Sequence, residues 1–263
     1  MNGAARGLKS LAEQAWLPIV LVIVWWFASD WWWSTTTDSK KAFLPPLSRI
    51  WDAFIEEAQS GDLGVNFVAS MRNIALGLLV GVVVGIAIGT VVGRSRAARA
   101  ILNPYLQFAR SVPQVALVPI IIGAFGITWV PKIWAIAIAC IWPILLNTVD
   151  GIRAIDPAVR DMTKAYRLTS GHELFRVVLP AALPQIMAGI RVSLGVAVVV
   201  MVVSEIYGST EGLGYFINYE KGLYRGPETW MATILVGLIG YGLSLAFLVV
   251  EKFTLRWYHE SAK

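Results

Sequence analysis

The sequence predicts an all-α protein that crosses a membrane about six times. Of its 263 residues, 57% are hydrophobic and only 15% are charged, whereas soluble domains carry about 25% charged residues. The apolar residues gather in runs long enough for helices to cross a bilayer. A segment at 1–14 precedes one transmembrane domain at 15–263, whose expected spans are about 16–33, 66–93, 104–127, 131–149, 185–206 and 229–250.

The first span begins after a mildly basic segment, as a signal peptide would. Its apolar core, however, ends in five tryptophans between Trp25 and Trp33 rather than in a small-residue cleavage site. Tryptophans at that level are typical of the membrane interface, so we expect the span to be retained. After a Pro-Pro break, an amphipathic helix follows with Ile50, Phe54 and Ile55 on one side. It lies along the membrane surface or packs on the other spans.

The second span carries glycines at strict four-residue spacing. They are Gly77, Gly81, Gly85, Gly89 and Gly93. On a helix they form one smooth stripe, which lets two helix backbones approach closely inside lipid. We expect a helix-packing seam here, against another span or another subunit.

The third span is interrupted by Pro113 and Pro119 and holds polar residues. Irregular backbone at membrane depth is tolerated where it is buried in protein or lines a water-filled cavity. Polar groups in spans mark a pathway, since they are unfavourable against lipid. The candidate pathway residues are Arg110, Gln114, Asn147, Ser204 and Glu205. Arg72 and Arg191 lie near span ends, where snorkelling to the interface is the favoured role.

The polar stretch 155–184 is predicted to form two short helices between the fourth and fifth spans. Asp156 can cap the first helix, with Pro157 at its first position. Ser170 and Glu173 have the spacing of a capping box that starts the second, and Pro180 and Pro184 end it. This hairpin either grips a soluble partner or is an ordinary loop between spans.

The distribution of positive charge predicts the orientation. With the N-terminus inside the cell, the inner segments hold thirteen Lys and Arg residues and the outer segments hold six. By the positive-inside rule, both termini and the hairpin face the cytoplasm. The net charge of +5 comes from short basic clusters between spans, so it does not suggest nucleic acid.

The sequence contains no arrangement of residues that is typical of a catalytic site. No nucleophile triad, phosphate-binding glycine loop or metal-ligand cluster is visible, and two isolated histidines make no metal site. The lone cysteine, Cys140, lies in an apolar run and is interpreted as a packing residue. We therefore expect no enzyme activity and no cofactor or metal in this chain.

The hairpin resembles a cytoplasmic loop of the permeases of ATP-binding-cassette importers, with the pattern E-A-A-x3-G-x9-I-x-L-P. Leu179-Pro180 matches the end of that pattern, Val177 stands at its isoleucine, and Asp161-Met162-Thr163 falls on E-A-A. Arg167 stands where the glycine is expected. The bend of the hairpin therefore lies either at Arg167 or at Thr169–Gly171.

The likeness extends over most of residues 44–256. RSVPQVALVPIIIGAFGI, PILLNTVDGIRAIDP, VVLPAALPQIMAGIRVSLG and VVSEIYGSTEGLGYFI, in this order, resemble permeases of the nitrate/sulfonate/taurine type. This resemblance implies a type I importer permease (MetI-like) fold and a multi-pass protein of the bacterial inner (plasma) membrane. It also implies a homodimer, two cytoplasmic ATPase subunits that bind ATP and Mg, and an extracytoplasmic solute-binding protein.

In such permeases the hairpin contains the coupling helix that docks on the ATPase. The residues it would use here are Asp161, Lys164, Arg167, Leu168, Thr169, Ser170, Glu173, Leu174 and Arg176, with Leu168 and Leu174 as apolar contacts. The resemblance favours a small organic anion as substrate, with sulfonates ahead of nitrate. The alternative is a secondary transporter or a channel that works without an ATPase.

Overall fold

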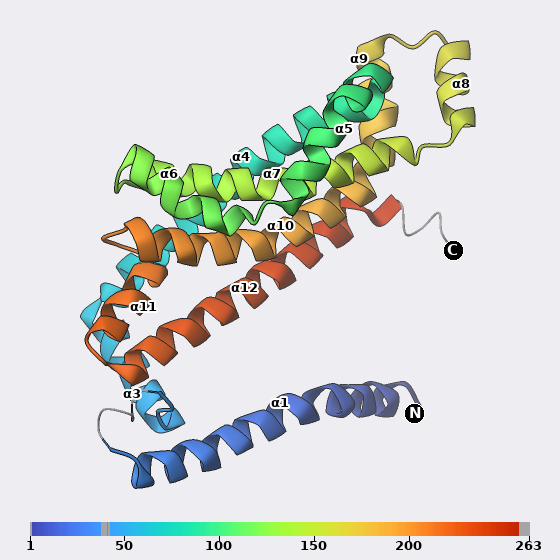
Figure 1. Ribbon diagram of the computed structural model, residues 1–263. Helices are drawn as coiled ribbons and strands as arrows, with labels where there is room; N and C mark the ends of the chain where they lie inside the picture. Colours follow the sequence, from blue (N-terminus) through green and yellow to red (C-terminus); the bar gives the residue numbers. More distant parts are fainter. Residues whose placement is uncertain (1, 38–40, 42, 258–263) are drawn as a thin grey trace. The chain divides into compact units, whose positions relative to one another are not determined.

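Every regular element in the described part of the chain is a helix. The computed structural model describes residues 2–37, 41 and 43–257, and Figure 1 shows their arrangement. The side chains of residues 2–15, Pro18 and Arg110 lie outside this description. The predicted all-α fold is confirmed.

The chain divides into two compact units. The larger unit comprises residues 65–215 and 236–263, and the smaller unit comprises residues 1–64 and 216–235. The helices are α1 (Asn2–Thr35), α3 (Leu47–Ser60), α4 (Asp62–Arg94), α5 (Arg96–Ser111), η1 (Gln114–Leu117), α6 (Val118–Phe125), α7 (Trp129–Arg153), α8 (Pro157–Ala165), α9 (Ser170–Glu173), η2 (Leu174–Val178), α10 (Leu179–Gly208), α11 (Leu213–Gly222) and α12 (Gly226–Thr254).

Within the described residues, four helices are long and apolar enough to cross a membrane. They are Asp62–Arg94, Trp129–Arg153, Ser170–Gly208 and Gly226–Thr254. A fifth span results if Arg96–Ala109 and Gln114–Phe125, which meet at 81°, count as one bent segment. The break falls beside Pro113, as predicted, whereas Pro119 lies in the first turn of α6 and does not interrupt it. The expected first span, 16–33, lies within α1 and is not among these helices.

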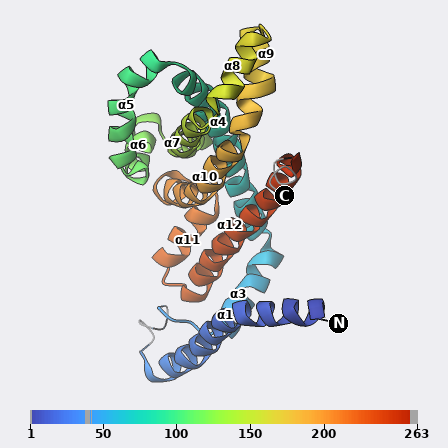
Figure 2. The same ribbon diagram turned by 90° about the vertical axis from the view of Figure 1, so that its right-hand side faces the viewer.

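Helices α7 and α10 run side by side at the centre of the larger unit (Figures 1 and 2). Small residues allow this, because a Cβ at Gly189 would stand only 2.9 Å from the Pro143 carbonyl oxygen. Cys140 is fully buried in the apolar core between them, so it packs as predicted. Ser193 Oγ donates a hydrogen bond of 3.0 Å to the Cys140 carbonyl oxygen, which keeps this polar group satisfied.

The glycine stripe of α4 lies against α7 of the same chain. A Cβ at Gly77 would stand 2.6 Å from Ile136 Cβ, and a Cβ at Gly89 would stand 2.7 Å from Thr148 Cβ. The side chains that fill the stripe are Ile136, Cys140, Ile144, Thr148 and Ile152, again four residues apart. Of the two partners that the sequence left open, the structure shows another span of the same chain.

The smaller unit is held by tryptophans. Trp25 and Trp230 meet edge to face, with ring centroids 4.6 Å apart. Trp25 Nε1 donates to the Pro45 carbonyl oxygen at 3.3 Å, and Trp230 Nε1 donates to that of Phe43 at 3.2 Å. These two bonds fix the segment before α3. The apolar face of α3 is narrower than predicted, since Ile50 is buried but Ile55 is 40% exposed.

Carboxylates gather in the smaller unit. Burial raises the pKa of Glu57, and the neighbouring carboxylates of Glu220, Asp62, Glu228 and Glu56 raise it further. Burial also raises the pKa of Glu220, against the opposing effect of the Arg225 guanidinium, 3.5 Å from its Oε2. These groups therefore favour the protonated form more than an exposed glutamate does.

Candidate functional site

The first arm of the hairpin, α8, begins as the sequence predicts. Asp156 Oδ1 accepts a hydrogen bond of 2.8 Å from the backbone N–H of Ala158, and Pro157 occupies the first helical position. The cap satisfies a backbone donor at the helix N-terminus. In Figure 1, α8 and α9 form a projection at one end of the α7–α10 pair.

The bend of the hairpin lies at Arg167, which adopts a left-handed backbone conformation with φ of +50°. The backbone N–H of Leu168 donates to the Thr163 carbonyl at 3.1 Å, and that of Arg167 donates to the Lys164 carbonyl at 2.9 Å. These two bonds form a Schellman motif, which usually has glycine in this position. Arg167 therefore fills the glycine position of the loop pattern, and the alternative bend at Thr169–Gly171 is wrong.

The second arm differs from the prediction. Thr169, not Ser170, is the N-cap of α9, and its carbonyl accepts from the Glu173 N–H at 2.9 Å. Pro180 and Pro184 do not end the helix, because α9 continues into α10 through the π-helical turn η2. Pro180 has no backbone N–H to donate, and in a regular α-helix its ring would clash with the carbonyl four residues earlier. The wider π-helical turn avoids this clash. The hairpin and the fifth span thus form one continuous segment, Ser170–Gly208.

The root of the hairpin is tied to the larger unit. Arg160 Nη2 donates to the Ile152 carbonyl oxygen at 2.6 Å, and Arg94 Nη2 forms an ion pair of 2.9 Å with Glu173 Oε2. Leu174 packs against an apolar cluster that includes Ile152 and Val178. In this structure Glu173 and Leu174 hold the hairpin to neighbouring helices, and their contact with a partner stays a prediction.

The hairpin exposes large apolar side chains in α8, at the bend and in η2. Tyr166 is 75% exposed, Phe175 70%, Met162 49% and Leu168 42%. Sequence reasoning named only Leu168 among these four. The exposure of the other three was also predictable, because large apolar residues in an otherwise charged stretch have no core to fill there.

The remaining coupling candidates also lie on this surface. Asp161 and Lys164 form an exposed ion pair of 2.9 Å within α8. Arg167, Thr169, Ser170 and Arg176 are exposed. The hairpin therefore exposes both apolar and charged groups.

The candidate pathway residues fall in separate places. Gln185 Nε2 donates to Asn147 Oδ1 at 2.8 Å, and Asn147 Nδ2 donates to the Pro143 carbonyl at 2.8 Å. Gln185 also lines a cavity of about 510 Å³ at the hairpin root, with Asp150 and Asp156. Gln114 is half-buried in η1, and the Arg110 side chain lies outside the described residues.

Ser204 and Glu205 lie near the opposite end of α10 and are completely buried. Glu205 Oε2 accepts from Ser70 Oγ at 2.8 Å and from the Gly214 N–H at 3.0 Å. Its Oε1 accepts from Asn73 Nδ2 at 3.0 Å. Three hydrogen bonds thus hold the buried carboxylate, while Ser204 Oγ donates back to the Met201 carbonyl at 2.8 Å.

The Glu205 network also holds the loop after α10. The Leu213 N–H donates to Ser70 Oγ at 2.8 Å, and the Gly212 N–H donates to Asn66 Oδ1 at 2.7 Å. A Cβ at Gly212 would stand 2.4 Å from Glu205 Cδ, so no side chain fits there. Lys132 is also buried and donates to Ser209 Oγ at 2.6 Å. No sequence pattern indicates these pairings, because most of the partners lie far apart along the chain.

Near the span ends, Arg72 and Arg191 make ion pairs. Arg72 Nη2 lies 2.7 Å from Glu211 Oε1, and its guanidinium lies over the Trp129 ring, 5.7 Å from the centroid. Arg191 pairs with Glu251 of α12. Both arginines thus have structural partners within the larger unit.

Comparison with known proteins identifies the family. Residues 63–256 match the model of the binding-protein-dependent transport system inner membrane component. The SsuC permease protein of Escherichia coli K12, named for aliphatic sulfonates transport, is 36% identical over 215 residues, 81% of each chain. The bicarbonate transport system permease protein CmpB of Synechococcus elongatus is 33% identical and covers 72% of this chain and 68% of its own.

A solved structure shares the fold. The inward-facing methionine ABC transporter MetNI superposes with a TM-score of 0.59 at 17% identity, covering 71% of this chain and 93% of that chain. The expected MetI-like fold is therefore confirmed. The relatives of this chain are membrane components of transporters and not enzymes. The chain belongs to the family of binding-protein-dependent transport system inner membrane components, and it is a multi-pass permease of an ABC importer.

Proposed function

We propose that this permease imports a small organic anion and is driven by ATP through the hairpin 155–184. It acts as a homodimer with two cytoplasmic ATPase subunits, which bind ATP and Mg, and it receives substrate from an extracytoplasmic solute-binding protein. The positive-inside count supports an orientation with both termini and the hairpin in the cytoplasm.

The observation that carries this proposal is the set of large apolar side chains exposed on the hairpin. Tyr166, Phe175, Met162 and Leu168 leave large apolar surfaces uncovered beside charged groups. An apolar patch with a charged rim is typical of a protein-binding surface. The hairpin is therefore suited to a groove on a soluble partner, with the aromatic side chains as its main anchors.

Two connections at the root of the hairpin link its movement to that of the central helices α7 and α10. On one side α9 continues through η2 into α10, and on the other side Arg160 ties α8 to the end of α7. Displacement of the tip by a closing ATPase dimer would therefore move both central helices together. This is rigid-body switching between two packed states, in which the pathway opens alternately to each side.

The substrate class follows from the relatives. SsuC is named for aliphatic sulfonates and CmpB for bicarbonate, and both substrates are small oxyanions. We assign a sulfonate to this permease first, because the SsuC likeness covers more of the chain. The solute-binding protein does most of the selection, while Asn147, Gln114 and Arg110 remain pathway candidates in the permease.

A hairpin variant tests the coupling. Tyr166→Asp places a charge at the tip without touching the root, and we expect the ATPase to be lost from the purified complex and transport to fall at least about tenfold. Tyr207→Asp is the matched control, since Tyr207 is 61% exposed at the far end of α10. Transport of a sulfonate by the lone chain in ATP-free vesicles would contradict the proposal and indicate a secondary transporter or channel.

A further inference from the structure

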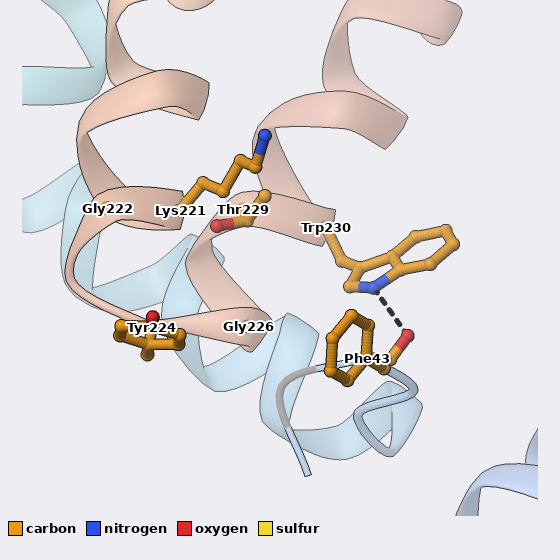
Figure 3. A pocket seen from close by; sticks show the side chains of 7 residues that line it. All are labelled: Phe43, Lys221, Gly222, Tyr224, Gly226, Thr229 and Trp230. Carbon is orange, nitrogen blue, oxygen red and sulfur yellow. Dashed lines mark hydrogen bonds between the residues drawn. The ribbon is translucent and has the colours of Figure 1, made fainter. Parts of the chain in front are cut away.

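The smaller unit contains a cavity of about 420 Å³ whose lining includes no residue of the hairpin or of the Glu205 network. It is lined by Phe43, Lys221, Gly222, Tyr224, Gly226, Thr229 and Trp230, which Figure 3 shows. Phe43 precedes α3, and Tyr224 lies in the turn between α11 and α12. The other lining residues belong to the end of α11 and the start of α12. The lining is aromatic, with one cation.

One wall of the cavity is fixed in place. Trp230 Nε1 donates to the Phe43 carbonyl oxygen at 3.2 Å, which Figure 3 marks, and the Trp230 ring also packs edge to face on Trp25. Both rings of the wall leave apolar surface toward the cavity, and Phe43 is 71% exposed. This wall is therefore a preformed surface for an apolar group.

On the other side, Tyr224 has a left-handed backbone with φ of +60°. The Arg225 N–H donates to the Glu220 carbonyl at 3.0 Å and the Tyr224 N–H donates to the Lys221 carbonyl at 3.1 Å, so the turn is a second Schellman motif. Glycine is the residue that fits this position without strain. A tyrosine that is 81% exposed gains nothing from burial there. A strained residue of this kind indicates a use for its side chain.

Of the two cations at this turn, Arg225 is paired with a carboxylate and Lys221 is available to bind an anion. Arg225 forms an ion pair with Glu220, 3.5 Å away, and that carboxylate belongs to the cluster with Glu57 and Glu228. The Lys221 ammonium has no hydrogen bond or ion pair within the described residues, although it lines the cavity. An oxyanion at this position would have an unshared positive charge to bind.

We propose that this cavity binds an amphiphilic oxyanion, with its phosphate or sulfonate head on Lys221 and its apolar body between Tyr224 and the Phe43–Trp230 wall. Two sources share this chemistry, an anionic phospholipid and an alkyl sulfonate. The site goes beyond the proposed function, since it depends neither on the hairpin nor on an ATPase.

Gly222 offers a way to fill the cavity without disturbing the fold. A Cβ at Gly222 would meet no atom within 4 Å, so Gly222→Leu places its side chain in open space. Gly64 in the same unit has equally free surroundings but does not line the cavity. Gly64→Leu is therefore the matched control, and Lys221→Glu is the second variant, which reverses the charge at an exposed position.

The experiment measures binding to the full chain in a mild neutral detergent. The first probe is dioleoyl phosphatidylglycerol, with phosphatidylcholine as its comparison; the second is octanesulfonate, with octyltrimethylammonium as its comparison. Bound probe is counted by native mass spectrometry, and the melting temperature without probe verifies folding. We expect at least one anionic probe to bind about tenfold more weakly to both Gly222→Leu and Lys221→Glu, and unchanged to Gly64→Leu.

The pattern of losses identifies the source. Loss of phosphatidylglycerol alone indicates a lipid site, and loss of octanesulfonate alone indicates a site for a free anion. Equal binding of both anionic probes to the wild-type chain and to both folded cavity variants would overturn the proposal. So would a lack of preference in both probe pairs, with phosphatidylglycerol bound no better than phosphatidylcholine and octanesulfonate bound no better than octyltrimethylammonium.

Discussion

Arg167 occupies a backbone conformation that glycine adopts with less strain. Its φ of +50° is stabilised by the two hydrogen bonds of the Schellman motif, not by contacts of the exposed side chain. Arg167→Gly should therefore stabilise the hairpin, by about 1 kcal/mol. Thermal unfolding and hydrogen exchange of α8 would measure the gain.

Lys164 supplies the control for this prediction. It lies inside α8 and is also exposed, but its helical backbone does not require glycine. Lys164→Gly should destabilise by about 1 kcal/mol, because glycine loses more backbone freedom in a helix. A destabilising Arg167→Gly would mean that the side chain, and not the backbone, fixes the bend.

The Glu205 carboxylate is a structural centre in this protomer. It accepts from Ser70, Asn73 and the Gly214 N–H, and it is fully buried. Glu205→Ala should destabilise the protein by about 3 kcal/mol, since three buried donors lose their acceptor. The midpoint of chemical unfolding in detergent checks this value.

The pathway role that the sequence suggested for Glu205 predicts a different result. A residue that only contacts substrate would lower transport while the unfolding midpoint stays unchanged. Reduced transport with wild-type stability in Glu205→Ala would therefore favour the pathway role over the structural one.

At the scale of elements, the packing of α4 on α7 depends on the absence of side chains. A Cβ at Gly89 would stand 2.8 Å from the Leu145 carbonyl oxygen, and backbone cannot move away as a flexible side chain can. Gly89→Ala should destabilise by about 2 kcal/mol through overpacking. The melting temperature of the purified chain would fall accordingly.

Gly195 in α10 provides the comparison, because a Cβ there would meet no atom within 4 Å. Gly195→Ala should leave stability unchanged or raise it by up to about 1 kcal/mol, since alanine favours a helix. Equal effects of the two substitutions would show that close packing is not what the stripe provides.

Elements that depend on neighbouring residues were predictable from the sequence. The Asp156 cap, the break at Pro113 and the stripe from Gly77 to Gly93 follow from local chemistry and spacing. Features that need a distant partner were not predictable. Asn73 and Glu205 are 132 residues apart, and Arg94 and Glu173 are 79 apart. The π-helical turn η2 was missed because proline ends most helices, whereas here a wider turn accommodates Pro180.

At the scale of the whole molecule, the smaller unit should respond to pH. The pKa values of Glu57 and Glu220 are raised above the ordinary value of 4.5, chiefly by burial. Protonation therefore stabilises this unit. The contribution is fully present below about pH 4.5 and is lost as the pH rises through the higher folded-state pKa values. Amide exchange of α3 and α11, corrected for intrinsic rates, should show more protection at pH 5 than at pH 8.

Glu57→Gln should weaken this pH dependence and raise protection at pH 8, because it removes one of the repelling carboxylates. Asp52→Asn, on the exposed side of α3 and outside the cluster, should leave the profile unchanged. An identical pH profile in Glu57→Gln and the wild-type chain would contradict the prediction.

The regular spacing of the α4–α7 contact leaves its register undetermined. Both helices repeat every four residues, so a slip of about 6 Å would place each glycine opposite the next partner. Polar groups at the two ends of α4 remove this degeneracy indirectly, because they bind the continuous α9–α10 segment, whose helix α10 packs on α7. Ser70 and Asn73 bind Glu205, while Arg94 binds Glu173. The apolar middle of α4 thus supplies adhesion, and its polar ends select one alignment out of several that pack almost equally well.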